Sequence, residues 1–168
     1  MHSIQYAGDV VVKGYFLGGC LSPKLRPISM TFRPAGVFGG IEANMEKSHA
    51  DFVARRPGGL STITVQCFPL MDVLAALGVY HVDYLSLDVE GPELEILRTV
   101  DWNRLRVDIL TVEYRVVTPV PRVMVDREAT AKKLEDLRRL FNETRLYREV
   151  ATISTLDAVF ERKDLTGV

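Results

Sequence analysis

Three acidic side chains stand at the ends of apolar stretches, where a catalytic or ligand-binding cleft would need them. Asp88 and Glu90 close the stretch at residues 82–89, and Glu113 lies near the end of a second one at residues 107–114. Carboxylates grouped in this way could accept a proton from a hydroxyl or amine, bind a divalent cation, or contact a cationic ligand. The spacing by itself leaves these three roles open.

The surrounding pattern predicts elements that would hold these acids in place. Residues 82–89 are predicted as a strand, Gly91 permits a sharp turn, and Pro92 suits the start of a helix. Residues 107–114 are predicted as the next strand. Because ligands bind beyond the carboxyl ends of strands in an open parallel sheet, we expect Asp88 and Glu90 at such an end, with Glu113 nearby.

An ordinary structural role is the alternative for each acid, because a carboxylate near a helix N-terminus also complements the helix dipole. We give both interpretations equal weight for the three acids of the proposed cleft. For Glu93 and Glu95, which fall inside the predicted helix, we favour the structural role. The basic residues of a later predicted helix are expected on a solvated face; these are Lys132, Lys133, Arg138 and Arg139.

The rest of the chain alternates between predicted strands and helices. Strands are expected at residues 28–32 and 62–67, a helix begins at Pro69, and Asp126 is expected to cap another helix. Residues 146–153 and 158–162 are predicted as an antiparallel hairpin. The prediction is therefore an α/β fold with a mostly parallel sheet and a C-terminal antiparallel hairpin.

Length and charge limit the classes of function. A chain of 168 residues favours a single domain over residues 1–168, in which residues 1–14 have no clear assignment. Residues 41–60 are polar and are expected to form a lid or a surface excursion. With 21 basic and 22 acidic residues, the net charge of −1 provides no field that would attract nucleic acid.

Cysteines, histidines and hydropathy add further expectations. Cys20 and Cys67 are expected to be reduced core thiols, with one disulfide left open as the alternative. The three histidines, His2, His49 and His81, are far apart in sequence, so no metal site is predicted. No apolar run of membrane-spanning length or signal peptide is present, so we expect a soluble, cytoplasmic chain.

Three stretches together resemble the FkbM-type methyltransferase family, and particularly its arthropod Star-like branch. They are residues 20–22 (Cys-Leu-Ser), residues 65–70 and, most specifically, residues 82–94 around Asp88. Trp102 and the chain end at residues 159–164 also fit the pattern. The resemblance extends from about Tyr15 to the C-terminus.

The resemblance implies a Rossmann-like fold that uses S-adenosylmethionine, with O-methyl transfer to a hydroxyl of a small molecule or a glycan. Asp88 would then take up the proton, with Glu90 supporting it, because methyl transfer mainly requires two positioned reactants and one proton acceptor. The residues implied at the cofactor are Asp88, Gly91 and Glu113.

The family's first strand, its Gly-rich turn and the acid that holds the ribose would precede Cys20, and only 19 residues do so here. We therefore expect an N-terminally truncated domain without the cofactor-binding half. It would be either a piece of a longer enzyme, whose anchor could place it on a secretory-pathway membrane, or a natural relic. The relic would be an inactive Star-like module for trafficking or protein interaction, associating with itself or a partner through an exposed sheet edge.

Overall fold

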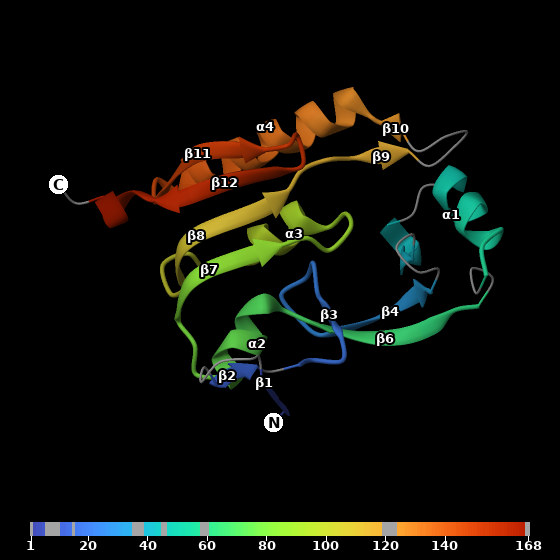
Figure 1. Cartoon of the computed structure of the whole chain (residues 1–168), viewed down its shortest axis with the longest axis horizontal. Helices are drawn as coiled ribbons and strands as arrows, with labels where there is room; N and C mark the ends of the chain where they lie inside the picture. Colours follow the sequence, from blue (N-terminus) through green and yellow to red (C-terminus); the bar gives the residue numbers. More distant parts are fainter. Residues whose placement is uncertain are drawn as a thin grey trace.

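The fold is taken from a computed structural model of the chain (Figure 1), which describes residues 2–5, 11–14, 16–34, 39–44, 47–57, 61–118 and 124–166. The first half contains β1 (His2–Gln5), β2 (Val11–Gly14), β3 (Cys20–Leu21), β4 (Ile28–Arg33), β5 (Gly40–Ile41), the short 3₁₀ turn η1 (Glu42–Asn44), α1 (Lys47–Ala54), β6 (Ile63–Phe68) and α2 (Leu70–Ala76). The second half contains β7 (His81–Leu87), α3 (Glu93–Arg98), β8 (Arg106–Glu113), β9 (Val117–Thr118), β10 (Met124–Val125), α4 (Arg127–Thr144), β11 (Tyr147–Ile153), β12 (Asp157–Arg162) and η2 (Lys163–Thr166).

The sheet that carries the predicted acids has the strand order β11-β12-β8-β7. Only β7 and β8 are parallel, and helix α3 lies in the crossover between them. The β11–β12 hairpin is antiparallel, as predicted, and β12 continues antiparallel beside β8. Strand β7 forms one edge of this sheet among the described residues.

A second four-stranded sheet has the order β3-β6-β4-β5. Strand β3 runs parallel to β6, whereas β4 pairs antiparallel with both β6 and β5. The prediction of a mostly parallel sheet is therefore wrong, and the fold is mixed α/β with two mixed sheets. The physical reason is that β4 returns beside β6 as an antiparallel neighbour, for which no helical crossover is required.

A disulfide joins Cys20 of β3 to Cys67 of β6, so the expectation of reduced thiols is wrong for both residues. The two cysteines are register partners on paired strands, and their Cα atoms are 4.3 Å apart. This juxtaposition brings together positions separated by 47 residues in sequence. No spacing rule in the sequence could have paired them, because the pairing depends on strand register.

The main core lies between the β7–β8–β12–β11 sheet and helices α3 and α4, which are on the same side of it in Figure 1. Asp126 caps α4 as predicted, since its side chain accepts a hydrogen bond from the Ala129 N–H. The apolar face of α4 buries Leu137 and Phe141 completely or nearly so. Phe141 packs edge-on against Tyr147 of β11, with ring centroids 5.2 Å apart.

The region from residue 41 to residue 60, predicted as a lid or surface excursion, contains η1 and α1 in its described part. Val53 of α1 is fully buried, so this region includes at least one core contact. Residues 45–46 and 58–60 lie outside the described residues. Whether the region acts as a lid stays a prediction.

Candidate functional site

The loop after β7 contains two consecutive residues with positive φ, and this backbone accounts for the glycine at position 91. Glu90 has a φ of 59° and Gly91 a φ of 138°, values that L side chains rarely adopt. Glycine carries no Cβ and tolerates this conformation, as the sequence predicts for Gly91. The loop therefore turns sharply after β7 and presents Asp88 and Glu90 at the carboxyl end of the strand.

The Glu93 carboxylate holds this loop in place from the first turn of α3. Its Oε1 atom accepts hydrogen bonds from the Val89 and Gly91 N–H groups, each at 3.0 Å. Its Oε2 atom lies 2.6 Å from the Nζ atom of Lys133. Glu93 is fully buried, and a buried carboxylate is costly unless it is paired. The ion pair with Lys133 and the two backbone donors supply that compensation.

Lys133 reaches this pair from α4, and its side chain is only 12% exposed. The expectation that Lys133 lies on a solvated helix face is therefore wrong, whereas Lys132 is exposed, with a side-chain exposure of 74%. The sequence did contain a signal. Lys133 stands three residues after the buried Thr130 and four before the buried Leu137, which places it on the apolar stripe of α4.

Glu113 enters the same site from the end of β8, as predicted. The parallel register pairs Leu87 with Val112, so Asp88 and Glu113 follow at the same end of the two strands. One carboxylate oxygen from each of Asp88, Glu93 and Glu113 can be chosen so that all three lie within 4.8 Å of one another. We call these three residues together with Glu90 the acidic cleft.

The electrostatics of the acidic cleft act most strongly on Glu113. The pKa of its carboxyl is raised to about 7, first by partial burial and then, in decreasing order, by the negative charges of Asp88, Glu90 and Glu93. Partial burial also raises the pKa of Glu90, followed in effect by Asp88 and Glu93. At neutral pH the cleft therefore holds one acid that can both take up and release a proton.

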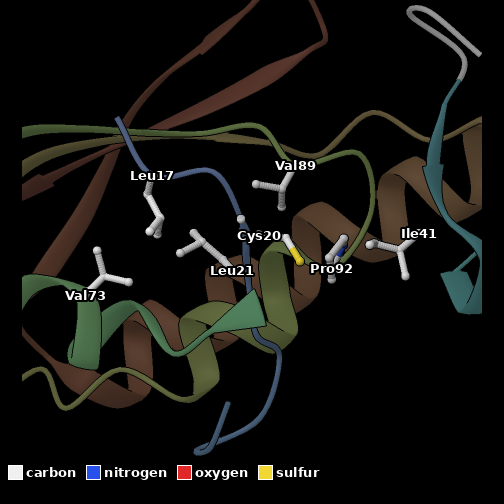
Figure 2. A pocket seen from close by; sticks show the side chains of 8 residues that line it. Leu17, Cys20, Leu21, Ile41, Val73, Val89 and Pro92 are labelled. Carbon is white, nitrogen blue, oxygen red and sulfur yellow. The ribbon is translucent and has the colours of Figure 1, made fainter. Parts of the chain in front are cut away.

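An apolar cavity of about 430 Å³ lies against the same loop (Figure 2). Val89 and Pro92, the residues on either side of the Glu90–Gly91 turn, form one part of its wall. The remaining lining residues come from the second sheet, α2 and the segment before β3; they are Leu17, Gly19, Cys20, Leu21, Ile41 and Val73. The loop thus carries acids of the acidic cleft and also contributes two residues to the wall of the apolar cavity.

This arrangement can perform acid–base chemistry or hold a positively charged group. Three carboxylates within 4.8 Å could also bridge a divalent cation, but both oxygens of Glu93 are already engaged, one by Lys133 and the other by two backbone N–H groups. Gly91 contributes its backbone conformation, and its predicted contact with a cofactor stays a prediction. The structure brings the predicted site residues Asp88, Glu90, Gly91 and Glu113 to one end of the sheet, and the role of each stays a prediction.

A strand, a sharp turn and a helix, with acids at the strand's carboxyl end, form the part of an α/β domain where ligands usually bind. The sequence of residues 29–121 matches the family described as the methyltransferase FkbM domain. This match spans 93 of the 168 residues and includes the whole acidic cleft, so the chain belongs to the FkbM methyltransferase domain family.

No curated protein and no solved structure gives a significant match to the chain. The match to the family model confirms the FkbM resemblance. The narrower Star-like assignment stays a prediction. Among the helices in the described ranges, none has the length and apolar character needed to cross a membrane.

Proposed function

We propose that this domain serves S-adenosylmethionine-dependent methyl transfer to a hydroxyl oxygen, with the acidic cleft as the reaction site. The observation that carries the proposal is Glu113, whose pKa of about 7 suits a group that accepts a proton at neutral pH. Family membership supports the reaction class. The acceptor we propose is a hydroxyl of a small molecule or a glycan.

The chemistry of the donor set fits the positive charge of the proposed cofactor. Asp88 and Glu113 offer carboxylate oxygens that are close together, and these would hold the cationic end of S-adenosylmethionine. Gly91 would leave the backbone of the loop accessible, because no atom lies within 4 Å of the position where a Cβ would be. The chemistry supplied by S-adenosylmethionine, when bound, is an electrophilic methyl group.

The proton of the acceptor hydroxyl would pass to the pair formed by Asp88 and Glu113. Two neighbouring carboxylates repel each other when both are ionised, so the first proton that the pair takes up is bound more tightly. Partial burial makes Glu113 the member that accepts this proton, and Asp88 lies beside it. Glu90 would add negative charge at the mouth of the cleft, and Glu93 would position the loop.

Calorimetric titration of the intact chain with S-adenosylmethionine and S-adenosylhomocysteine tests this proposal. We expect saturable binding of both ligands, and weaker binding of the cationic S-adenosylmethionine to an Asp88→Asn variant. Glu95→Gln, which removes an exposed acid from the neighbouring helix α3, is the matched control and should bind both ligands as the wild type does. No heat and no thermal stabilisation at saturating ligand would refute the enzymatic function of this chain.

A second candidate function is that of an inactive protein-interaction module. It is favoured by β7, which has a strand neighbour on one side only among the residues described and carries the 57%-exposed Tyr84. An open strand edge of this kind can pair with another chain. Sedimentation measurements over a range of concentrations would reveal self-association, and Tyr84→Lys should weaken it if β7 is the contact.

The Cys20–Cys67 disulfide supports an oxidising compartment, such as the secretory pathway, in preference to the cytoplasm. Both cysteines are used in this bond. Mass spectrometry after alkylation of the chain, purified from its native cells under conditions that trap thiols, would test this location. Two alkylated cysteines without prior reduction would contradict it.

A further inference from the structure

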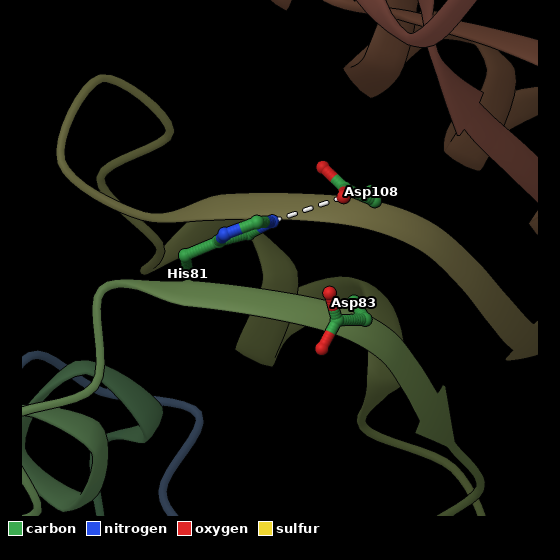
Figure 3. Close-up of side chains that lie close together, drawn as sticks. All are labelled: His81, Asp83 and Asp108. Carbon is green, nitrogen blue, oxygen red and sulfur yellow. Dashed lines mark hydrogen bonds and ion pairs between the residues drawn. The ribbon is translucent and has the colours of Figure 1, made fainter.

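A second group of chemically active side chains lies at the opposite end of β7 from the acidic cleft. His81 and Asp83 are two residues apart on β7, so their side chains emerge on the same face of the sheet. Asp108 stands on the neighbouring strand β8, between residues that pair with Val82 and Tyr84. Figure 3 shows the three side chains on adjacent strands, with the imidazole directed toward Asp108.

The three donor groups come close to one point. The Nε2 atom of His81 lies 2.9 Å from the Oδ2 atom of Asp108. One ligand atom from each of His81, Asp83 and Asp108 can be chosen so that all lie within 4.8 Å of one another. Both strands are held in a parallel ladder from His81 to Leu87, so the backbone positions of the three residues are set by the sheet.

The orientation of Asp108 is set by a neighbour that leaves one oxygen available. Arg106 donates from Nε to the Oδ1 atom of Asp108 at 2.8 Å and from Nη1 to Asp164 at 3.0 Å. A carboxylate fixed through one oxygen by an outer hydrogen bond is the usual arrangement of a metal ligand in proteins. The remaining oxygen, Oδ2, is the one that faces His81.

The other two groups are accessible from solvent. The His81 side chain is 53% exposed, and Asp83 is also exposed. Within the described part of the chain, no hydrogen bond or ion pair engages the Asp83 carboxylate. The imidazole nitrogen distinguishes this group from an ordinary acidic surface patch. Imidazole is a preferred ligand of transition metals such as zinc, whereas magnesium and calcium prefer oxygen ligands.

We propose that His81, Asp83 and Asp108 form a binding site for a divalent transition cation such as Zn²⁺. Bonds of about 2.0–2.1 Å from zinc to nitrogen and oxygen would span the 2.9 Å between Nε2 and Oδ2 at an angle of roughly 90°. Widening that separation by roughly 0.4 Å gives the tetrahedral angle. Asp83 supplies the third ligand after a side-chain rotation, and water completes the coordination.

Such a cation would cross-link β7 to β8 at the amino ends of the two strands. Because β7 is an edge strand among the described residues, this bond would reduce local opening of the sheet. A ligand that binds only the folded chain also raises its unfolding temperature. The site and the acidic cleft lie at opposite ends of β7, so occupation of one is separable from occupation of the other.

Isothermal titration of the intact, metal-free chain with ZnCl₂ in a non-chelating buffer at neutral pH tests the proposal. We expect one equivalent of Zn²⁺ to bind, and His81→Gln and Asp83→Asn each to weaken binding by at least about tenfold. Both residues are exposed, so both variants should keep the wild-type circular dichroism spectrum. Zn²⁺ should raise the unfolding temperature of the wild type more than that of either variant.

Two control variants assign the binding to this site. His49→Gln removes a histidine elsewhere in the chain, and Asp88→Asn removes a carboxylate from the acidic cleft. Both variants should bind Zn²⁺ as the wild type does. Absence of Zn²⁺ binding by the wild type at millimolar concentration would overturn the proposal. So would a His81→Gln variant with unchanged affinity, or loss of the bound equivalent in Asp88→Asn.

Discussion

Glu113 offers the sharpest test of the electrostatics in the acidic cleft. Its carboxyl has a usual pKa of 4.5, and partial burial beside Asp88 raises the folded-state value to about 7. Between these two pH values the folded chain holds a proton that the unfolded chain has released. Stability from this group is therefore complete below pH 4.5 and is lost as pH rises to about 7.

The size of the effect follows from the difference between the two pKa values. Each tenfold change in proton affinity is worth about 1.36 kcal/mol, so the full difference corresponds to about 3.4 kcal/mol. Glu113 is only half-buried, and solvent screening reduces the expected loss to about 1–2 kcal/mol. Glu113→Gln lacks this loss. As pH rises from 4.5 to 8, the free energy of unfolding of the variant should therefore increase relative to that of the wild type by about 1–2 kcal/mol.

Urea unfolding of the disulfide-bonded chain at a series of pH values measures this difference. Glu113→Met is the matched control, because it also lacks a titrating group at this position. Its free energy of unfolding should change with pH as that of Glu113→Gln does, even if its absolute stability differs. Carbon NMR of the carboxyl group should give a lower pKa for Glu113 in Asp88→Asn, since that substitution removes a neighbouring charge. A difference between wild type and Glu113→Gln that is flat, or that grows toward low pH, would refute the reasoning.

Three further substitutions test contacts that hold the site and the core, and urea unfolding measures each. Glu93→Gln leaves a buried lysine unpaired and should cost about 3–5 kcal/mol, whereas the exposed Glu95→Gln should change stability by less than about 0.5 kcal/mol; equal effects would contradict the buried pair. Replacing Cys20 and Cys67 together by serine opens a 47-residue loop and should cost about 4 kcal/mol, and no loss would argue against the disulfide. Tyr147→Phe removes a buried hydroxyl that donates to a backbone carbonyl of β8 at 3.0 Å, and should cost about 1 kcal/mol; a stabilised variant would exclude this bond.

The elements around the site were predictable because their signals are local. The alternation and turn residues at residues 146–162 predicted the antiparallel hairpin, and Asp126 predicted the start of α4. Gly91 predicted the sharp turn after β7, which has the positive φ that glycine tolerates. Glu113 was expected near Asp88 because successive parallel strands end at the same edge of a sheet.

The strand order was less predictable, because pairing depends on contacts that no short window contains. Strand–helix alternation favoured a mostly parallel sheet, but β4 and β6 pair antiparallel over five residues. The same alternation of apolar residues suits either direction, since side-chain periodicity along a strand does not report the direction of its neighbour. The sequence therefore predicted the strands of the second sheet better than their arrangement.

The sequence by itself determined the family, the local elements and the presence of acids at the end of β7. Only the tertiary structure decided the partners of those and other reactive groups. Glu93 meets Lys133 across 40 residues, Cys20 meets Cys67 across 47, and His81 meets Asp108 across 27. Each pair requires two elements to pack or pair in one register, so its chemistry appears when the chain folds and cannot be read from spacing along it.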